Sequence, residues 1–125
     1  MEPLGPLQLR LMDHIWKTGP CTVHEIHAAF NAVQATRSLA YTTYLTVLRN
    51  LTKRGFLNQV KGNRAHVFVP LVDERTHKLA MVRQVRRDLC GGDVGVMLGY
   101  LAMDDEIDIR IRDKISILAN SSKSA

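Results

Sequence analysis

Four side chains in residues 39–54 have the types and the spacing to bind a polyanion. If this segment is a helix, Thr42, Thr46, Arg49 and Lys53 share one face, because residues three and four positions apart are neighbours on a helix surface. Threonine hydroxyls can donate or accept hydrogen bonds at a base edge, and the two cations can pair with phosphates. A face that only contacts solvent usually mixes acids with bases, and this face has no acid.

The opposite face of the same segment is apolar, with Tyr44, Val47, Leu48 and Leu51 in one stripe. A helix of this kind packs on a core through its apolar face and presents the polar face outward. Gly55 follows directly and is typical of the residue that ends a helix. The pattern therefore predicts a helix that carries hydroxyls at its start and cations toward its end, as expected of a helix that enters the major groove of DNA.

The stretch between Ile26 and Val72 contains no aspartate or glutamate. Its six basic residues are Arg37, Arg49, Lys53, Arg54, Lys61 and Arg64. The chain has a formal net charge of +5, and residues 1–70 account for all of it, because residues 71–125 hold equal numbers of basic and acidic side chains. A surface with one sign of charge favours a polyanionic partner over simple solubilisation.

A hairpin with a basic tip is expected after the helix. Two β-type stretches, residues 56–61 and 65–69, flank a Gly-Asn-Arg turn, and Lys61, Arg64 and His66 lie at or beside that turn. A tip of this composition can lie along the sugar–phosphate backbone or enter the minor groove.

Two more helices are expected before the basic segment. Pro6 suits the first turn of one, which ends at Gly19, and Thr22 with Glu25 has the spacing of a capping box that starts the next. We therefore predict a mostly α, α+β fold: a winged helix-turn-helix over residues 1–71, an α-helical dimerisation region over 72–120, and a disordered tail over 121–125.

Three helices are expected in the second half. Asp73 and Asp93 can cap the first two, and the acidic residues 104–106 suit the start of the last. The isoleucines from Ile107 onward alternate as in a strand but also fit one helical face, and the helical neighbours favour a helix. Apolar side chains of these three helices are expected to form the interface of a homodimer: Leu79, Val82, Leu89, Leu98, Leu101, Ile107, Ile111, Ile115 and Leu118.

Enzymatic chemistry is not expected, and neither is a cofactor or a metal. Cys21, His24 and His27 lack the paired spacing of a good zinc site, and no Gly-rich phosphate loop or nucleophile motif occurs. Two cysteines without a disulfide framework and the absence of a long apolar run indicate a cytoplasmic protein. Two alternatives stay open: a regulator that binds a small ligand near Met81, Met97 and Met103, and a winged helix that binds only protein.

The sequence resembles the penicillinase and methicillin-resistance repressor family, of the BlaI/MecI type. Residues 39–57 (LAYTTYLTVLRNLTKRGFL) are similar to the recognition helix of that family, and residues 9–16 (LRLMDHIW) to its first helix. The resemblance extends over about residues 4–118 and implies a homodimer that represses transcription from a palindromic operator. By position, it implies that DNA contacts fall on Thr42, Thr43, Leu45 and Thr46 and on the wing near Arg64. Tyr41, directly before them, is a further candidate contact.

The resemblance also bears on how repression ends. In antibiotic-responsive members a membrane sensor with a metalloprotease domain triggers cleavage of an Asn-Phe bond in the penultimate helix. The matching pair in this chain is Gly99-Tyr100, which keeps the aromatic residue and lacks the asparagine. The resemblance thus implies a cleavage site at Gly99 and Tyr100, whereas copper sensing is not expected because the chain has no C-terminal cysteine cluster. At Leu45 the chain also departs from the polar residue of some members.

Overall fold

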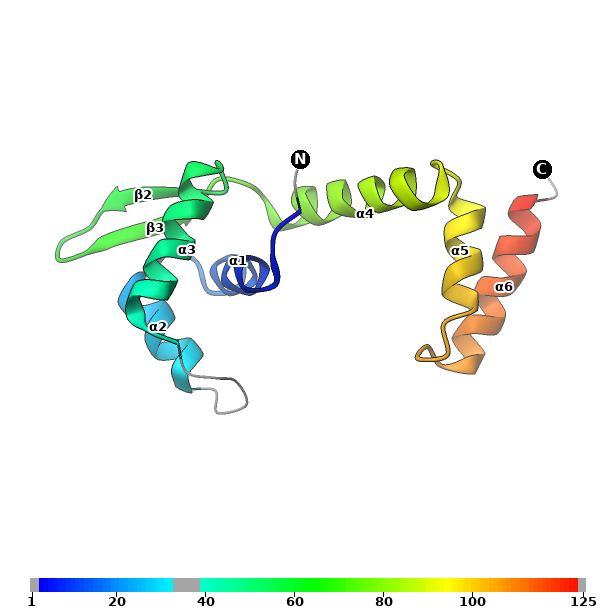
Figure 1. Ribbon diagram of the computed structural model, residues 1–125, viewed down its shortest axis with the longest axis horizontal. Coiled ribbons are helices and arrows are strands. Elements are labelled where there is room, and N and C mark those ends of the chain that lie inside the picture. The colour runs from blue at the N-terminus through cyan, green and yellow to red at the C-terminus, as the bar shows by residue number, and fades with distance from the viewer. Residues whose placement is uncertain (1–2, 33–38, 124–125) are drawn as a thin grey trace. The chain divides into compact units, whose positions relative to one another are not determined.

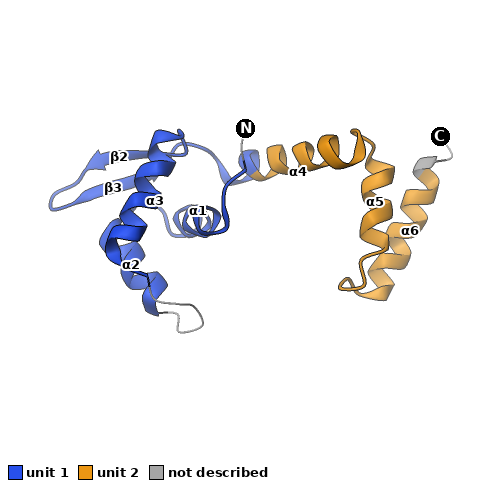
Figure 2. Cartoon of the chain, in the orientation of Figure 1, with its two compact units in different colours: residues 1–77 blue, residues 78–125 orange. Residues whose placement is uncertain are grey.

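The computed structural model describes residues 3–32 and 39–123, and Arg37 lies outside these ranges. The chain divides into two compact units, residues 1–77 and residues 78–125 (Figure 2). Each unit is described by itself below. In neither is there a described helix with the length and the apolar character needed to cross a membrane.

The first unit contains three helices and a small antiparallel sheet (Figure 1). In chain order its elements are α1 (Pro6–Thr18), β1 (Cys21–Thr22), α2 (Val23–Ala32), α3 (Tyr41–Lys53), β2 (Leu57–Lys61) and β3 (His66–Pro70). The strand order is β1-β3-β2, and the β2–β3 hairpin forms the wing. This arrangement confirms the predicted mostly α, α+β winged helix.

Strand β1 was not predicted, because two residues are too few to show an alternating pattern. Its two residues pair with residues of β3, which lie much further along the chain: Cys21 pairs with Phe68 and Thr22 pairs with Val67. The pairing joins the start of α2 to the wing strand β3.

One hydrophobic core holds the first unit together. Leu11 and Ile15 of α1, Leu48 of α3 and Phe68 of β3 are completely buried, and the apolar stripe of α3 supplies much of this core. Full burial of a leucine, isoleucine or phenylalanine side chain contributes about 1.5–3 kcal/mol relative to exposure. The three helices and the sheet are therefore fixed against one another within this unit.

The predicted start of α2 and the predicted end of α3 are confirmed, whereas α3 begins at Tyr41, two residues after the predicted start at residue 39. The backbone N–H of Thr22 donates to Glu25 Oε1 at 3.0 Å, and the N–H of Glu25 donates to Thr22 Oγ1 at 3.1 Å, which is a complete capping box. Gly55 after α3 has a φ of +87°, a conformation that favours glycine over residues with a side chain.

The boundary between the units falls after His77, six residues beyond the predicted end of the DNA-binding domain at residue 71. The ring of His77 lies 5.8 Å from that of Trp16 and 5.2 Å from that of Phe56, measured between centroids. In addition, Trp16 Nε1 donates to the carbonyl of Val72 at 2.8 Å. These contacts hold the segment leading into α4 on the first unit.

The second unit is helical, with α4 (Glu74–Cys90, which begins in the first unit), α5 (Val94–Ala102) and α6 (Ile109–Lys123). The carboxylate of Asp93 accepts from the backbone N–H of Gly95 at 2.8 Å, as expected for a cap, and Asp73 accepts from the N–H of Thr76 at 3.1 Å. Helix α5 packs against α6.

Two expectations for the last helix are wrong. The acidic residues 104–106 lie in the connection before α6, and Asp108 takes their expected place by accepting from the N–H of Arg110 at 2.8 Å. The helix also continues through Lys123, so the expected disordered tail is helical at residues 121–123. Residues 124–125 lie outside the described part of the chain.

Candidate nucleic-acid interface

Helix α3 presents the predicted polar face to solvent. Thr42, Thr46, Arg49 and Lys53 are all exposed, and we call these four residues the α3 polar face. On the opposite side Tyr44 is almost completely buried, as are Leu48 and Leu51. The amphipathic pattern thus fixes which side of α3 is available to a partner.

The hydroxyls of the α3 polar face differ in what they can offer. Thr46 Oγ1 donates to the carbonyl oxygen of Thr42 at 2.9 Å, so its remaining capacity is that of an acceptor. Thr43 is half-buried beside this face, and Leu45 is half-buried and packs against the core. Among the expected contact residues, Leu45 is therefore the one most engaged with the protein itself.

Side-chain hydrogen bonds fix the position of α3 at both ends. At its start, Asn31 of α2 donates to the carbonyl of Leu39 at 3.1 Å and accepts from the hydroxyl of Tyr44 at 3.1 Å. Toward its end, Gln8 of α1 donates to Asn50 Oδ1 at 2.6 Å. Because the helix is held by neighbours on two sides, its polar face is preorganised rather than free to rotate.

Arg54 has a structural role that the sequence did not indicate. Its guanidinium donates to Gln8 Oε1 at 3.2 Å and lies 5.2 Å from the centre of the Phe56 ring. It is half-buried, whereas Arg49 and Lys53 of the same basic segment are exposed. Charge counting along the chain cannot separate these roles, because it does not register the glutamine and the aromatic ring that surround Arg54.

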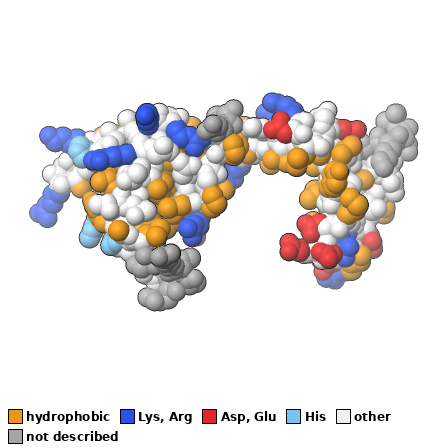
Figure 3. All heavy atoms as spheres, in the orientation of Figure 1, with side chains coloured by type: hydrophobic (Ala, Val, Ile, Leu, Met, Phe, Trp, Pro, Cys, Tyr) orange, Lys and Arg blue, Asp and Glu red, His pale blue; other side chains and the backbone are white. Residues whose placement is uncertain are grey.

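The wing carries its cations on an exposed tip. Lys61, Arg64 and His66 are exposed, and Gly62 donates its N–H to the carbonyl of Ala65 at 3.0 Å to close the turn. A Cβ atom added at Gly62 would lie 2.5 Å from that carbonyl oxygen, so the tight turn requires glycine. On the face drawn in Figure 3, Lys, Arg and His side chains surround the helices and hairpin of this unit.

A concavity of about 250 Å³ lies where α2, α3 and the wing meet. Its polar lining comes from different elements and includes His24 of α2, Tyr41 and Arg49 of α3, and His66 of β3. No aspartate or glutamate lines it among the residues that the structure describes. This hollow was not predicted, because it depends on how the hairpin folds back toward α3.

Glu25 is the nearest acidic residue along the chain to this concavity, and its charge is already engaged. Hydrogen bonds from the backbone N–H and the side-chain hydroxyl of Thr22 are the main cause that lowers the pKa of Glu25 below its ordinary value. The charge of His24 lowers this pKa further. The carboxylate stays ionised as a helix cap and is not among the residues that line the concavity.

Cys21, His24 and His27 do not converge on one point. The Cys21 thiol is buried and donates to the carbonyl of Gly19 at 3.1 Å, while the ring of His27 lies 5.9 Å from those of Tyr41 and Tyr44. Within the described ranges no three His, Cys, Asp or Glu side chains come together in a way that could hold a metal ion.

The second unit exposes many of its apolar side chains. Of the nine predicted dimerisation residues, Leu79, Val82, Leu89, Leu101, Ile111 and Leu118 are exposed, and the other three, Leu98, Ile107 and Ile115, are half-buried. Further exposed apolar side chains of this unit were not on the predicted surface: Val85, Val94, Val96, Tyr100, Met103, Ile109 and Ile117. A surface this apolar is unusual for a part of a protein that contacts only water.

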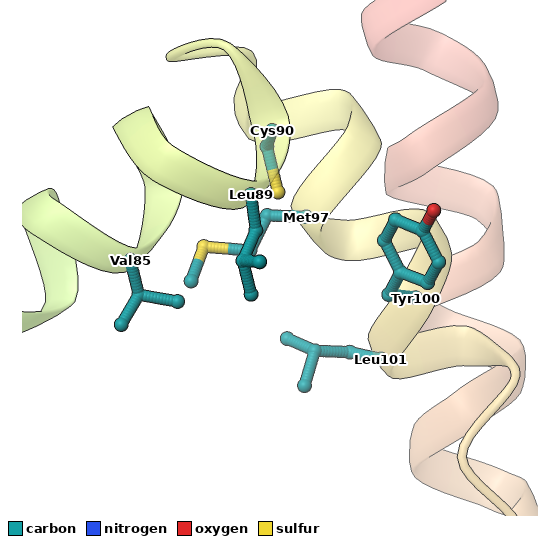
Figure 4. A pocket seen from close by; sticks show the side chains of 6 residues that line it. All are labelled: Val85, Leu89, Cys90, Met97, Tyr100 and Leu101. Carbon is teal, nitrogen blue, oxygen red and sulfur yellow. The ribbon is translucent and has the colours of Figure 1, made fainter.

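An apolar groove of about 450 Å³ lies within the second unit (Figure 4). Val85, Leu89 and Cys90 of α4 line it together with Met97, Tyr100 and Leu101 of α5. Of the three methionines considered for a ligand pocket, only Met97 is part of this lining.

The Gly99-Tyr100 bond lies in the middle of α5. Tyr100 is 62% exposed, and a Cβ atom added at Gly99 would meet no atom within 4 Å. The bond is therefore close to the surface, but its backbone is helical.

Comparison with known proteins identifies the family. Residues 4–118 match the family model described as penicillinase repressor. Over 69 residues the chain is 44% identical to a protein named transcriptional regulator BlaI from Mycobacterium tuberculosis, in strain CDC 1551 / Oshkosh and in strain ATCC 25618 / H37Rv. The match covers 54% of this chain and 48% of each relative, so the chain spans about half the length of the curated relatives it matches. With the family model covering nearly all of its length, the chain belongs to the penicillinase repressor family.

Proposed function

We propose that this protein is a transcriptional repressor, not an enzyme, that binds an operator in double-stranded DNA as a homodimer. The observation that carries the proposal is the α3 polar face beside a basic wing, within a stretch of 47 residues that has no acidic side chain. The family and the name of the curated relatives agree with a role in transcription.

In the proposed complex α3 enters the major groove. Thr42, Thr43 and Thr46 approach base edges from the first half of the helix, and Arg49 and Lys53 pair with phosphates. Tyr41 and Leu45 lie beside them. Lys61, Arg64 and His66 place the wing on the sugar–phosphate backbone. The phosphate contacts supply affinity and orientation, and the threonines supply base discrimination.

The exposed apolar side chains of residues 78–123 support a homodimer. The largest exposed fractions include 74% at Leu89, 68% at Met103 and 66% at Ile117, and such side chains are stabilised when a second copy covers them. The apolar groove in Figure 4 would then receive side chains of the second protomer. Two linked winged helices read a palindrome whose half-sites lie about one helical turn apart, and linkage raises affinity through effective concentration.

Release by proteolysis at Gly99-Tyr100 is the second part of the proposal. A protease needs an extended backbone, and α5 is a nine-residue helix that contains two glycines, Gly95 and Gly99. Each glycine disfavours a helix by roughly 0.5–1 kcal/mol relative to alanine, so α5 can open locally at modest cost. Cleavage would separate α6 from the rest of the chain and remove part of the dimer surface.

Intact-mass measurement tests the release step. The protein is recovered from cells grown with and without a β-lactam, and the expected product is a fragment that ends at Gly99. Replacing Gly99-Tyr100 by Pro-Tyr should abolish that fragment. If only the full-length mass is found under induction, the release step is wrong.

Fluorescence anisotropy tests the repressor function itself. Duplex from the protein's own upstream promoter is titrated at low and physiological salt, with a scrambled duplex as control. The expected result is tight binding to the promoter, two protomers per site and a steep loss of affinity with salt. Equal, weak binding to both duplexes would contradict a repressor and favour a winged helix that binds protein.

A further inference from the structure

We propose that the concavity between α2, α3 and the wing holds one backbone phosphate of the operator, and that His24 and His66 make this contact depend on proton uptake. The proposal rests on the proposed function, because it concerns the same DNA-binding face. It adds a binding site for one anion, formed where the helix and the hairpin lie close together. It also adds a dependence of DNA binding on pH.

The geometry of the concavity suits a phosphate better than a base. Arg49 and Tyr41 of α3 face it from one side, His66 of β3 from another and His24 of α2 from a third. All four side chains end in hydrogen-bond donors, and Arg49 carries a permanent positive charge. The volume of about 250 Å³ is sufficient for one phosphate group, and the hydrogen-bond donors and the positive charge of the lining favour an anion there.

The two imidazoles are exposed, so a phosphate from outside the protein can reach both of them. The charged and titratable groups beside them are Arg49 and Tyr41 on α3, Lys61 paired in register with His66 on β2, Arg64 at the wing tip, and Glu25 on α2. Only Glu25 is acidic, and its carboxylate already accepts the N–H of Thr22.

Proton uptake and phosphate binding are therefore coupled. Histidine is the side chain that changes charge within the range of about pH 5–8. A phosphate brings the negative charge that the lining of this concavity lacks, and it stabilises the imidazolium form. By linkage, protonation of His24 and His66 must then strengthen operator binding by the same factor.

The test compares operator affinity at pH 6 and pH 8, by anisotropy, in the full chain and in His24→Gln/His66→Gln. Wild-type affinity is expected to rise about tenfold at pH 6, as one additional charge-assisted contact per protomer allows. The slope of log affinity against log salt should steepen by about 0.9 per additional phosphate neutralised. In the double variant the ratio of the affinities at pH 6 and pH 8 should fall to about one, whatever its affinity at pH 8.

His14→Gln is the matched control. It makes the same change at a histidine that does not line the concavity and whose ring lies 5.5 Å from Phe30. This variant should keep the full pH response. A second measurement needs no variant: the NMR titration midpoints of His24 and His66 should move to higher pH when operator duplex is added.

The outcomes separate the two claims. If the wild type does not prefer operator over scrambled duplex at either pH, the proposed function fails. If the wild type does prefer the operator but the double variant keeps the wild-type pH response, the proposed phosphate site is wrong and the proposed repressor function stands. An equal loss of affinity in the double variant at both pH values would also overturn the phosphate site, because the side chains would then act without their charge.

Discussion

The two units of this chain treat their apolar residues in opposite ways. In residues 1–77 the apolar faces of three helices and a sheet meet in one core, where Leu11, Leu48 and Phe68 are completely buried. Among the described residues of 78–121 only Gly95 and Ala119 are buried, and Leu89 is 74% exposed. The first unit therefore buries a hydrophobic core of its own, whereas the second unit leaves most of its apolar side chains exposed.

The comparison predicts where stability depends on protein concentration. A unit that buries its own core unfolds at the same denaturant concentration at any dilution, but a unit completed by a second copy loses stability as protein is diluted. Four changes, ordered from the largest expected effect to the smallest, test this distinction.

The largest effect is expected in the core of the first unit. Phe68→Ala should lower the free energy of unfolding by about 4 kcal/mol, because it removes a fully buried ring and leaves a cavity. Urea unfolding followed by circular dichroism at two protein concentrations measures this loss. The loss should be the same at both, and a loss that varies with concentration would contradict a self-contained first unit.

A smaller effect is expected on the exposed surface of the second unit. Leu89→Asp should raise the dissociation constant of the homodimer about 30-fold or more, because it places a charge on an apolar contact surface. Leu71→Asp is the matched control, since Leu71 is 60% exposed but belongs to the first unit. Sedimentation velocity distinguishes them, and equal effects of the two variants would remove the basis for the dimer surface.

Helix caps offer the same chemical change in both units. Thr22→Ala removes the cap of α2 and Asp93→Ala that of α5, and each should cost about 1 kcal/mol. The cost of Thr22→Ala should appear as lower stability at every protein concentration. Asp93→Ala should lower a melting transition whose midpoint itself falls on dilution, in thermal melts recorded over a hundredfold concentration range. Midpoints that are independent of concentration in both variants would mean that the units do not differ.

The smallest expected effect is a pH dependence that comes from the cap of α2. Because hydrogen bonds from Thr22 lower the pKa of Glu25, the ionised carboxylate stabilises the folded state above its ordinary value of 4.5, and this contribution is lost as the pH falls through the lowered value. Glu25→Gln should flatten this acid-range decline in melting temperature. Asp105→Gln, at an exposed acidic residue of the second unit, should leave the decline unchanged.

Local chemistry explains why much of the first unit could be predicted. The capping box at Thr22 and Glu25, the positive φ at Gly55 and the two faces of α3 each depend on residues within a few positions of one another. The family resemblance stated from residues 9–16 and 39–57 is confirmed by the family model over residues 4–118.

The features that could not be predicted depend on contacts distant in sequence. Arg54 was counted only as one of the six basic residues, because Gln8, which accepts from its guanidinium, lies 46 positions away along the chain. The concavity with His24 and His66 exists only because β1 pairs with β3. The start of α6 was misplaced for a different reason: three aspartates, Asp104, Asp105 and Asp108, offer competing caps, and composition alone does not select Asp108.

The aromatic contact at the end of the first unit gives the protein a built-in optical reporter. The chain has a single tryptophan, and Trp16 lies beside the ring of His77 while its indole N–H donates to the carbonyl of Val72. Its emission therefore arises from one environment, the place where α4 joins the winged helix. A change of emission wavelength on DNA binding or on cleavage would report, without any label, whether the first turn of α4 has left that position.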